Sequence, residues 1–170
     1  KYNMIYVCPD YRATTSWMGP KAEADMVQII QELKNTYRIE KIIITGGSMG
    51  GSSSLSFTAM HPELIQGVVA MNGTANHLEY KNYQDAIHES FGGTQQEIPE
   101  EYKRRSAEYW PERFTMPVAI TTGGKDTAVP PESTTRLASI LKIFNPYVLH
   151  IHRPETGHTT SYEDARSEER

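Results

Sequence analysis

The chain has 170 residues, enough for one domain of ordinary size with a substantial hydrophobic core. Its 17 Lys and Arg against 21 Asp and Glu give a formal net charge of −4 without a basic stripe, so we expect no nucleic-acid partner. The single cysteine excludes an internal disulfide and a multi-cysteine zinc site. The early apolar run at residues 4–8 is too short to span a bilayer, and no membrane span is expected. The sequence does not decide the compartment: the protein could be cytoplasmic, or it could be secreted after removal of a signal peptide.

Apolar segments along the chain alternate between strand-like and helix-like patterns. Strands are predicted over residues 4–7, 42–45, 67–71, 118–122 and 148–152. Helices are predicted over about 20–34, 48–60 and 131–144, and a final helix is expected to begin near residue 161 with a capping-box pattern. The uninterrupted apolar residues of 42–45 suit a strand that is buried on both faces. This alternation predicts an α/β fold, with a mostly parallel sheet and helices on both faces.

The segment from 72 to 117 is too long to be a simple connection between two strands. It is rich in aromatic and charged residues, so we expect a cap insertion over about 74–116 that has short helices of its own and covers a site. Its basic run at residues 103–105 is expected on a solvated helix face, with local anion binding as the alternative. The chain as a whole, 1–170, is predicted to be a single domain.

A glycine-rich turn directly after the predicted strand at 42–45 carries the most specific motif of the chain. Residues 46–50 read Gly-Gly-Ser-Met-Gly and fit G-x-S-x-G between a strand and a helix, which makes Ser48 the candidate nucleophile. The backbone N–H of Met49, at the helix N-terminus, is the candidate oxyanion donor. A phosphate-binding loop is the alternative, but G-x-G-x-x-G fits in no frame and Ser52 stands where the Walker pattern requires lysine.

A serine nucleophile requires a base and an acid that orients the base, and both follow Ser48 in the required order. Asp126 comes after the predicted strand at 118–122, and His158 comes after the predicted strand at 148–152. Taken singly, Asp126 could be a turn or capping aspartate and His158 an ordinary surface histidine. Their joint order and placement predict the catalytic triad Ser48, Asp126 and His158.

Other polar residues give weaker signals. His150 and His152 alternate along one strand and could share a metal, but no third ligand lies near them in the sequence, so no metal site is expected and bonding to protein partners is favoured. Asn72-Gly73-Thr74 matches the glycosylation pattern, yet its place after a strand favours a turn. No cofactor is expected.

Several segments together resemble the α/β-hydrolase superfamily, in its prolyl-oligopeptidase-like (peptidase S9) and dienelactone-hydrolase-like branch. The segments that carry the resemblance are 8–12, 46–51, 91–94, 102–106, 123–131 and 157–162. The resemblance implies the α/β-hydrolase fold and a serine hydrolase. It also implies further N-terminal strands and an oxyanion-forming loop before the point where this sequence begins, so we expect the C-terminal portion of a longer hydrolase.

The substrate class is open between three hypotheses. We expect two-step acyl transfer on a carboxylic ester, such as an acylated carbohydrate, because the chain has no room for a propeller domain that would filter peptides. The first alternative is a serine peptidase of the prolyl-oligopeptidase type, which the resemblance implies. The second is a catalytically weak binding domain that lacks a full oxyanion hole. The partner is a small-molecule ester or a peptide, and the sequence does not indicate an oligomeric state.

Overall fold

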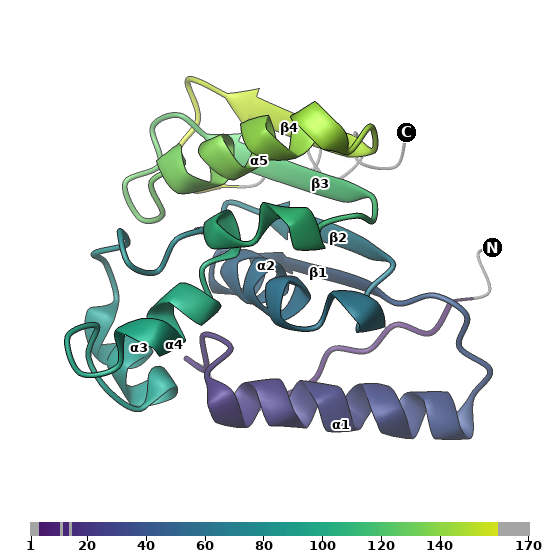
Figure 1. The fold of residues 1–170 in the computed structure, drawn as a ribbon. Coiled ribbons are helices and arrows are strands. Elements are labelled where there is room, and N and C mark those ends of the chain that lie inside the picture. Colours follow the sequence, from purple (N-terminus) through teal and green to yellow (C-terminus); the bar gives the residue numbers. More distant parts are fainter. Residues whose placement is uncertain (1–3, 11, 14, 160–170) are drawn as a thin grey trace.

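The sheet of this protein has four parallel strands in the order β1-β2-β3-β4 (Figure 1). A computed structural model describes residues 4–10, 12–13 and 15–159. The strands are β1 (Ile43–Gly47), β2 (Gly67–Met71), β3 (Val118–Gly123) and β4 (Val148–Arg153). The predicted α/β fold with a parallel sheet is confirmed. Because every strand runs in the same direction, the segments that follow them meet at one edge of the sheet.

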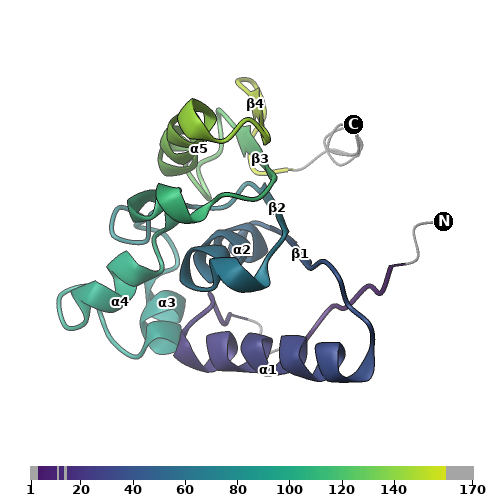
Figure 2. The same ribbon diagram turned by 45° about the vertical axis from the view of Figure 1, so that its right-hand side comes forward.

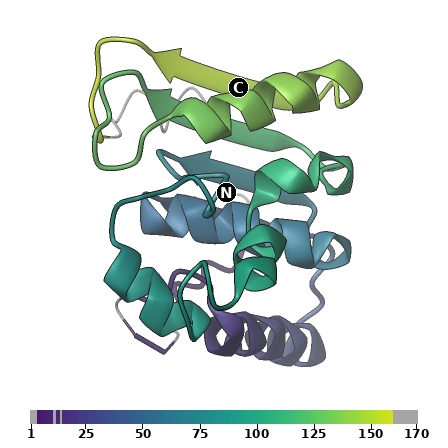
Figure 3. The same ribbon diagram turned by 60° about the vertical axis from the view of Figure 1, so that its left-hand side comes forward.

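Three long helices, α1 (Pro20–Thr36), α2 (Met49–Met60) and α5 (Glu132–Phe144), lie over the same face of the sheet (Figures 2 and 3). Burial alternates along β1, where Ile43 is 58% exposed and Ile44 packs against the core. The expectation that this strand is buried on both faces is therefore wrong. Helices were predicted on both sides of the sheet, whereas the helices of the described residues gather on one.

The main core lies between this helical layer and the sheet. It combines apolar side chains of β2 and β3, such as Val68 and Ile120, with Leu55 and Phe57 of α2 and Leu137 of α5. Helix α2 is buried almost all round even though it contains four serines and a threonine. Three of these hydroxyls donate to main-chain carbonyls one turn earlier, from Ser52, Ser54 and Thr58, and so enter the interior with their hydrogen bonds made.

The segment between β2 and β3 holds the short helices α3 (Gln84–Phe91) and α4 (Pro99–Arg104) and the 3₁₀ turns η2 (Ala107–Tyr109) and η3 (Pro111–Arg113). A further 3₁₀ turn, η1 (Pro62–Leu64), precedes β2. Helix α3 contacts α1, whereas η2 and η3 contact both α2 and α5 (Figure 1). The second half of this segment thus completes the helical layer of the fold. The helices α3 and α4 contribute to a separate aromatic cluster around Phe91 and Tyr102.

The strand predicted at residues 4–7 is absent from the structure, and the predicted C-terminal helix is not tested by it. Residues 4–7 form no strand, and their side chains are exposed, with Tyr6 at 83%. A strand is stable only when it pairs with a neighbour, and the described sheet provides no strand beside this segment. The final helix expected near residue 161 lies outside the described residues.

Candidate active site

Ser48 occupies the sharp turn between β1 and α2. Its φ of 56° and ψ of −120° lie in a region that a residue with a side chain rarely adopts. The Ser48 N–H donates to the carbonyl oxygen of Met71 at 2.8 Å, which anchors the turn to the end of β2. A Cβ atom at Gly46 would lie 2.4 Å from the main chain of Gly50, so the turn closes only with glycine at position 46. A Cβ atom at Gly50 would meet no atom within 4 Å, so this second glycine of the motif is not required by packing.

The three predicted triad side chains lie together in the structure. His158 Nε2 lies 2.7 Å from Ser48 Oγ, and His158 Nδ1 lies 2.7 Å from Asp126 Oδ2. The pair of distances fits a neutral imidazole that donates from Nδ1 to the carboxylate and accepts at Nε2 from the hydroxyl. The carboxylate is only 1% exposed, whereas the imidazole is 34% exposed. The arrangement therefore offers a solvent-accessible base in contact with a hydroxyl and backed by a buried anion.

The loop after β3 fixes the Asp126 carboxylate. Asp126 Oδ1 accepts the N–H groups of Ala128 at 3.0 Å and Val129 at 2.9 Å, which leaves Oδ2 for His158. The same loop is held from outside by the Tyr80 hydroxyl and the Asn82 amide, which both donate to the carbonyl of Ala128. Burial, with smaller contributions from Tyr83 and Asp126, raises the pKa of the Tyr80 phenol well above its ordinary range, so it stays a donor at neutral pH.

Sequence reasoning missed these supporting residues. Tyr80 and Asn82 belong to the insertion, where no motif distinguishes them from the other aromatic and polar side chains. The sequence predicts only a turn at Asn72, whereas the structure places its amide nitrogen 3.1 Å from the carbonyl oxygen of His158. The one sequence feature that could have indicated this role is the position of Asn72 directly after a strand, at the sheet edge that also carries the G-x-S-x-G motif.

Met49 is the first residue of α2. Its N–H lies in the first helical turn, where main-chain donors have no acceptor within the helix and the helix dipole is positive. The Met49 side chain packs against the cluster that contains Trp17 and Tyr80. An anionic oxygen beside Ser48 would meet at least this one main-chain donor.

His150 and His152 share a protein partner. Thr122 Oγ1 lies 2.8 Å from His150 Nε2 and 2.9 Å from His152 Nδ1, so the hydroxyl occupies the space between the two imidazoles. Burial, with the positive charge of Lys142 and then the neighbouring His152, lowers the pKa of His150 to about 4. Within the part of the chain that the structure describes, no group of three or more His, Cys, Asp or Glu residues could hold a metal ion.

A buried group of charges joins α1 to α4. Arg105 is fully buried, and its guanidinium lies 2.8 Å from Glu23 and 3.1 Å from Glu101. Although burial opposes ionisation, the hydrogen bond from Arg104 and the charge of Arg105 leave the pKa of Glu23 below its ordinary value. The expectation of a solvated face for 103–105 is therefore wrong for Arg105, because an acidic side chain from α1 compensates its charge.

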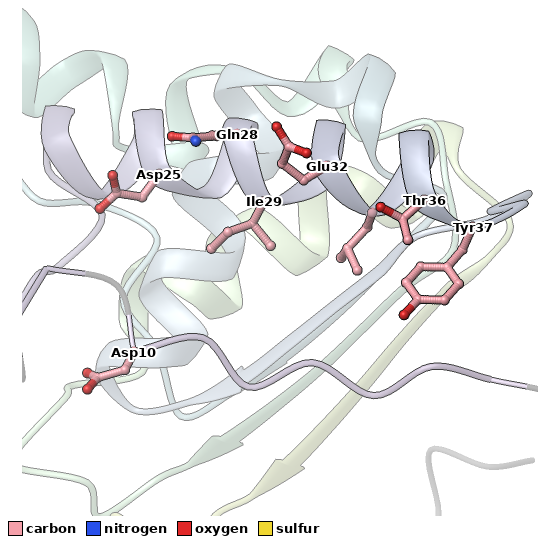
Figure 4. Close-up of a pocket in the computed structure, with 8 residues that line it drawn as sticks. Asp10, Asp25, Gln28, Ile29, Glu32, Thr36 and Tyr37 are labelled. Atoms are coloured by element: carbon pink, nitrogen blue, oxygen red, sulfur yellow. The ribbon is translucent and has the colours of Figure 1, made fainter.

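A groove lies between the N-terminal segment and the outer side of α1 (Figure 4). Asp10 lies across it from Asp25, Ile29 and Glu32 of α1 and from Tyr37, which directly follows the helix. None of the triad side chains lines this groove, and it contains no candidate nucleophile with an adjacent base. It is therefore separate from the candidate active site.

Comparisons with known proteins support the resemblance inferred from the sequence. A family model described as the prolyl oligopeptidase family matches residues 4–170. A search of curated proteins finds no match. None of the described helices is long and apolar enough to cross a membrane.

Solved structures share the fold at low sequence identity. Dipeptidyl peptidase 4 of Porphyromonas gingivalis superposes with a TM-score of 0.72 at 16% identity, covering 91% of this chain and 23% of that chain. An acylaminoacyl peptidase of Pyrococcus horikoshii gives a TM-score of 0.70 at 18% identity, covering 87% of this chain and 25% of that chain. A puromycin-hydrolyzing peptidase of Mycobacterium tuberculosis gives a TM-score of 0.68 at 20% identity, covering 84% of this chain and 23% of that chain. The chain thus spans a quarter or less of the length of these proteins.

Proposed function

Because the chain belongs to the prolyl oligopeptidase family, we propose that it carries the triad of a serine peptidase, with Ser48 as nucleophile, His158 as base and Asp126 as the group that orients the base. The observation that supports this most is the contact of 2.7 Å between His158 Nε2 and the hydroxyl of a serine held in a strained turn. A free serine hydroxyl is a weak nucleophile at neutral pH, and a base at this distance is what activates it.

The proposed reaction is a two-step acyl transfer. His158 Nε2 takes the proton of Ser48 as Oγ attacks the carbonyl carbon, and the N–H of Met49 donates to the oxyanion that develops. The imidazolium then gives its proton to the leaving amine, the C–N bond breaks, and an acyl-serine ester remains. Water attacks this ester while His158 takes its proton, and the serine leaves with that proton as the carboxylic acid product is released. Asp126 holds Nδ1–H and stabilises the imidazolium throughout.

A peptide is favoured over the carboxylic ester expected from the sequence. The expectation of an ester rested on chain length alone, whereas the family and the solved structures that share the fold are described as peptidases. A chain that spans a quarter or less of those structures leaves open where a filter for peptides would lie, so length is no argument against a peptidase. The two contacts of 2.7 Å among the three side chains favour an enzyme over the weak-binding-domain alternative, which is motivated by an incomplete oxyanion hole.

Labelling of the intact protein with a fluorophosphonate tests the nucleophile. We expect one label, located on Ser48 by mass spectrometry, and no label in Ser48→Ala protein with an unchanged far-UV spectrum. Labelling that persists in Ser48→Ala would overturn the assignment of the nucleophile. An unlabelled native protein would favour the binding-domain alternative.

The substrate class is tested with compounds that share one leaving group. We expect kcat/KM for p-nitroanilides to rise by a factor of about 10² or more when the acyl group is extended from acetyl to a short peptide, since a peptidase uses remote binding energy in the transition state. Hydrolysis of p-nitrophenyl esters without turnover of any peptide anilide would contradict the peptidase proposal and favour a carboxylic ester as the substrate.

A further inference from the structure

Asn72 lies where two parts of the candidate active site meet. It follows the last residue of β2, its N–H donates to the carbonyl of Thr121 at 2.9 Å, and it is only 6% exposed. The amide nitrogen Nδ2 donates to the carbonyl oxygen of His158 at 3.1 Å. The preceding residue, Met71, accepts the N–H of Ser48. Two consecutive residues at the end of one strand therefore contact the main chain of the nucleophile and of the base.

We propose that Asn72 is a positioning residue, which fixes the main chain of His158 relative to Ser48. The proposal rests on the proposed function, because it assigns Asn72 a role in serving that same triad. A ring hydrogen bond to Asp126 sets the direction of the imidazole but leaves the loop that carries it free to shift. A hydrogen bond to the carbonyl of the same residue removes that freedom at the point where the side chain begins.

The position of His158 in the chain explains why such support is needed. It lies on the loop after β4, where the preceding residues are tied to the loop after β3, with Gly124 N–H donating to Arg153 and Lys125 N–H donating to Thr156. These bonds end two residues before His158. A side chain with 34% exposure on a loop must still keep both ring nitrogens at 2.7 Å from their partners. A displacement of about 1 Å at such a contact can cost about 10²-fold in rate.

The backbone at position 72 narrows the choice of side chain. Asn72 has a φ of 48°, in the left-handed region that glycine, asparagine and aspartate tolerate best. Glycine adopts it without strain but has no donor, and an ionised aspartate has acceptors only. Asparagine combines this backbone with an N–H that can reach a carbonyl.

The test compares Asn72→Gly with a matched change in the same segment of the intact protein. Asn72→Gly keeps the backbone conformation and removes the donor. Asn76→Gly is the control, because Asn76 is also buried after β2 but its amide donates to Glu108, away from the triad. We expect kcat of Asn72→Gly to fall by roughly 10² with KM within a factor of about two, since a misplaced base slows the chemical step more than binding. The control should keep kcat within a factor of about three even if it unfolds at lower urea.

A second variant separates position from charge. Asn72→Asp removes the donor and adds an anion near the imidazolium, which favours the charged form of His158. We expect its kcat to fall as well, and the acid limb of its pH–rate profile to move to higher pH than in Asn72→Gly. A purely structural asparagine would not produce the KM-against-kcat split, whereas the shift of the acid limb reports only the charge added near His158.

The outcomes distinguish the positioning role from the triad itself. If native protein takes one fluorophosphonate label and Asn72→Gly takes it at the native rate, the positioning role is wrong and the triad stands. If Asn72→Gly and Asn76→Gly lose the same kcat in proportion to lost unfolding free energy, Asn72 is structural only. If the native protein takes no label, the proposed function fails, and the role of Asn72 fails with it.

Discussion

Two polar clusters of this molecule are each built from distant segments, and they differ in what their environment does. The proposed triad joins the ends of β1, β3 and β4, and its imidazole reaches solvent. The charge cluster joins α1 to α4, and the Arg105 guanidinium at its centre is fully buried. In the proposed triad, a buried anion lies behind the imidazole that would accept the serine proton. In the charge cluster, opposite charges compensate one another and hold the insertion to the body of the fold.

The comparison teaches that burial of a charge is not itself a sign of function. Arg105 is the more deeply buried group, yet its guanidinium contacts the carboxylates of Glu23 and Glu101, the sulfur of Met60 and the ring of Phe91, and none of these is paired with a base as a nucleophile would be. His158 is partly exposed but contacts a strained serine. We therefore expect substitutions in the two clusters to separate rate from stability.

The largest expected effect is on rate, in Asp126→Asn. The amide cannot hold the imidazole in the tautomer that accepts at Nε2, so kcat should fall by about 10⁴. The free energy of unfolding, measured by urea denaturation, should change far less than the activation barrier. Equal losses in both quantities would show that the loop after β3 depends on the carboxylate for its fold.

Arg105→Met is expected to lower stability more than rate, the opposite of Asp126→Asn. Removing one partner of a buried ion pair leaves Glu23 partly uncompensated, so the free energy of unfolding should fall by about 3 kcal/mol. The control is Arg136→Met, because Arg136 pairs with Glu79 and Glu108 but is 44% exposed, and its loss should cost less than about 1 kcal/mol. Similar losses of unfolding free energy for both substitutions would mean that burial does not strengthen the ion pairs of the charge cluster around Arg105.

His77 extends the charge cluster and predicts a dependence of stability on pH. Complete burial, aided by the charge of Arg105, lowers its pKa from 6.5 to about 3. Between those values the unfolded chain binds a proton that the folded chain does not, so stability is full above pH 6.5 and is lost as pH falls, by up to about 1.4 kcal/mol per pH unit. Urea unfolding of native and His77→Gln protein at pH 7 and pH 5 should show a flatter dependence in the variant. Parallel curves would contradict the prediction.

The smallest effect is expected at Gly50, one of the two glycines of the serine motif, and Gly46 is its contrast. Gly50→Ala should raise the free energy of unfolding by up to about 1 kcal/mol, because a Cβ there meets open space and alanine favours the helix. Gly46→Ala should instead destabilise the protein, since its Cβ would overlap the main chain of Gly50. Thermal unfolding of the pair checks this, and equal shifts of Tm would contradict the packing at the turn.

Elements whose signals are local could be predicted from the amino-acid sequence. A β-branched run that ends in G-x-S-x-G specifies a strand, a tight turn and a helix, and the order Ser48, Asp126, His158 follows from residues placed after strands. The helices at 20–36, 49–60 and 132–144 were predicted within a few residues, because apolar periodicity and Pro or Gly at the ends act over short distances.

Contacts between distant segments could not be predicted in this way and became evident from the folded chain. The absence of pairing at residues 4–7, the burial of Arg105 and the contact of Asn72 with His158 all depend on which segment lies alongside. An apolar run pairs only if another strand is next to it, and a charge is buried only if an opposite charge meets it. These are properties of neighbours in space, and local sequence patterns carry no record of such neighbours.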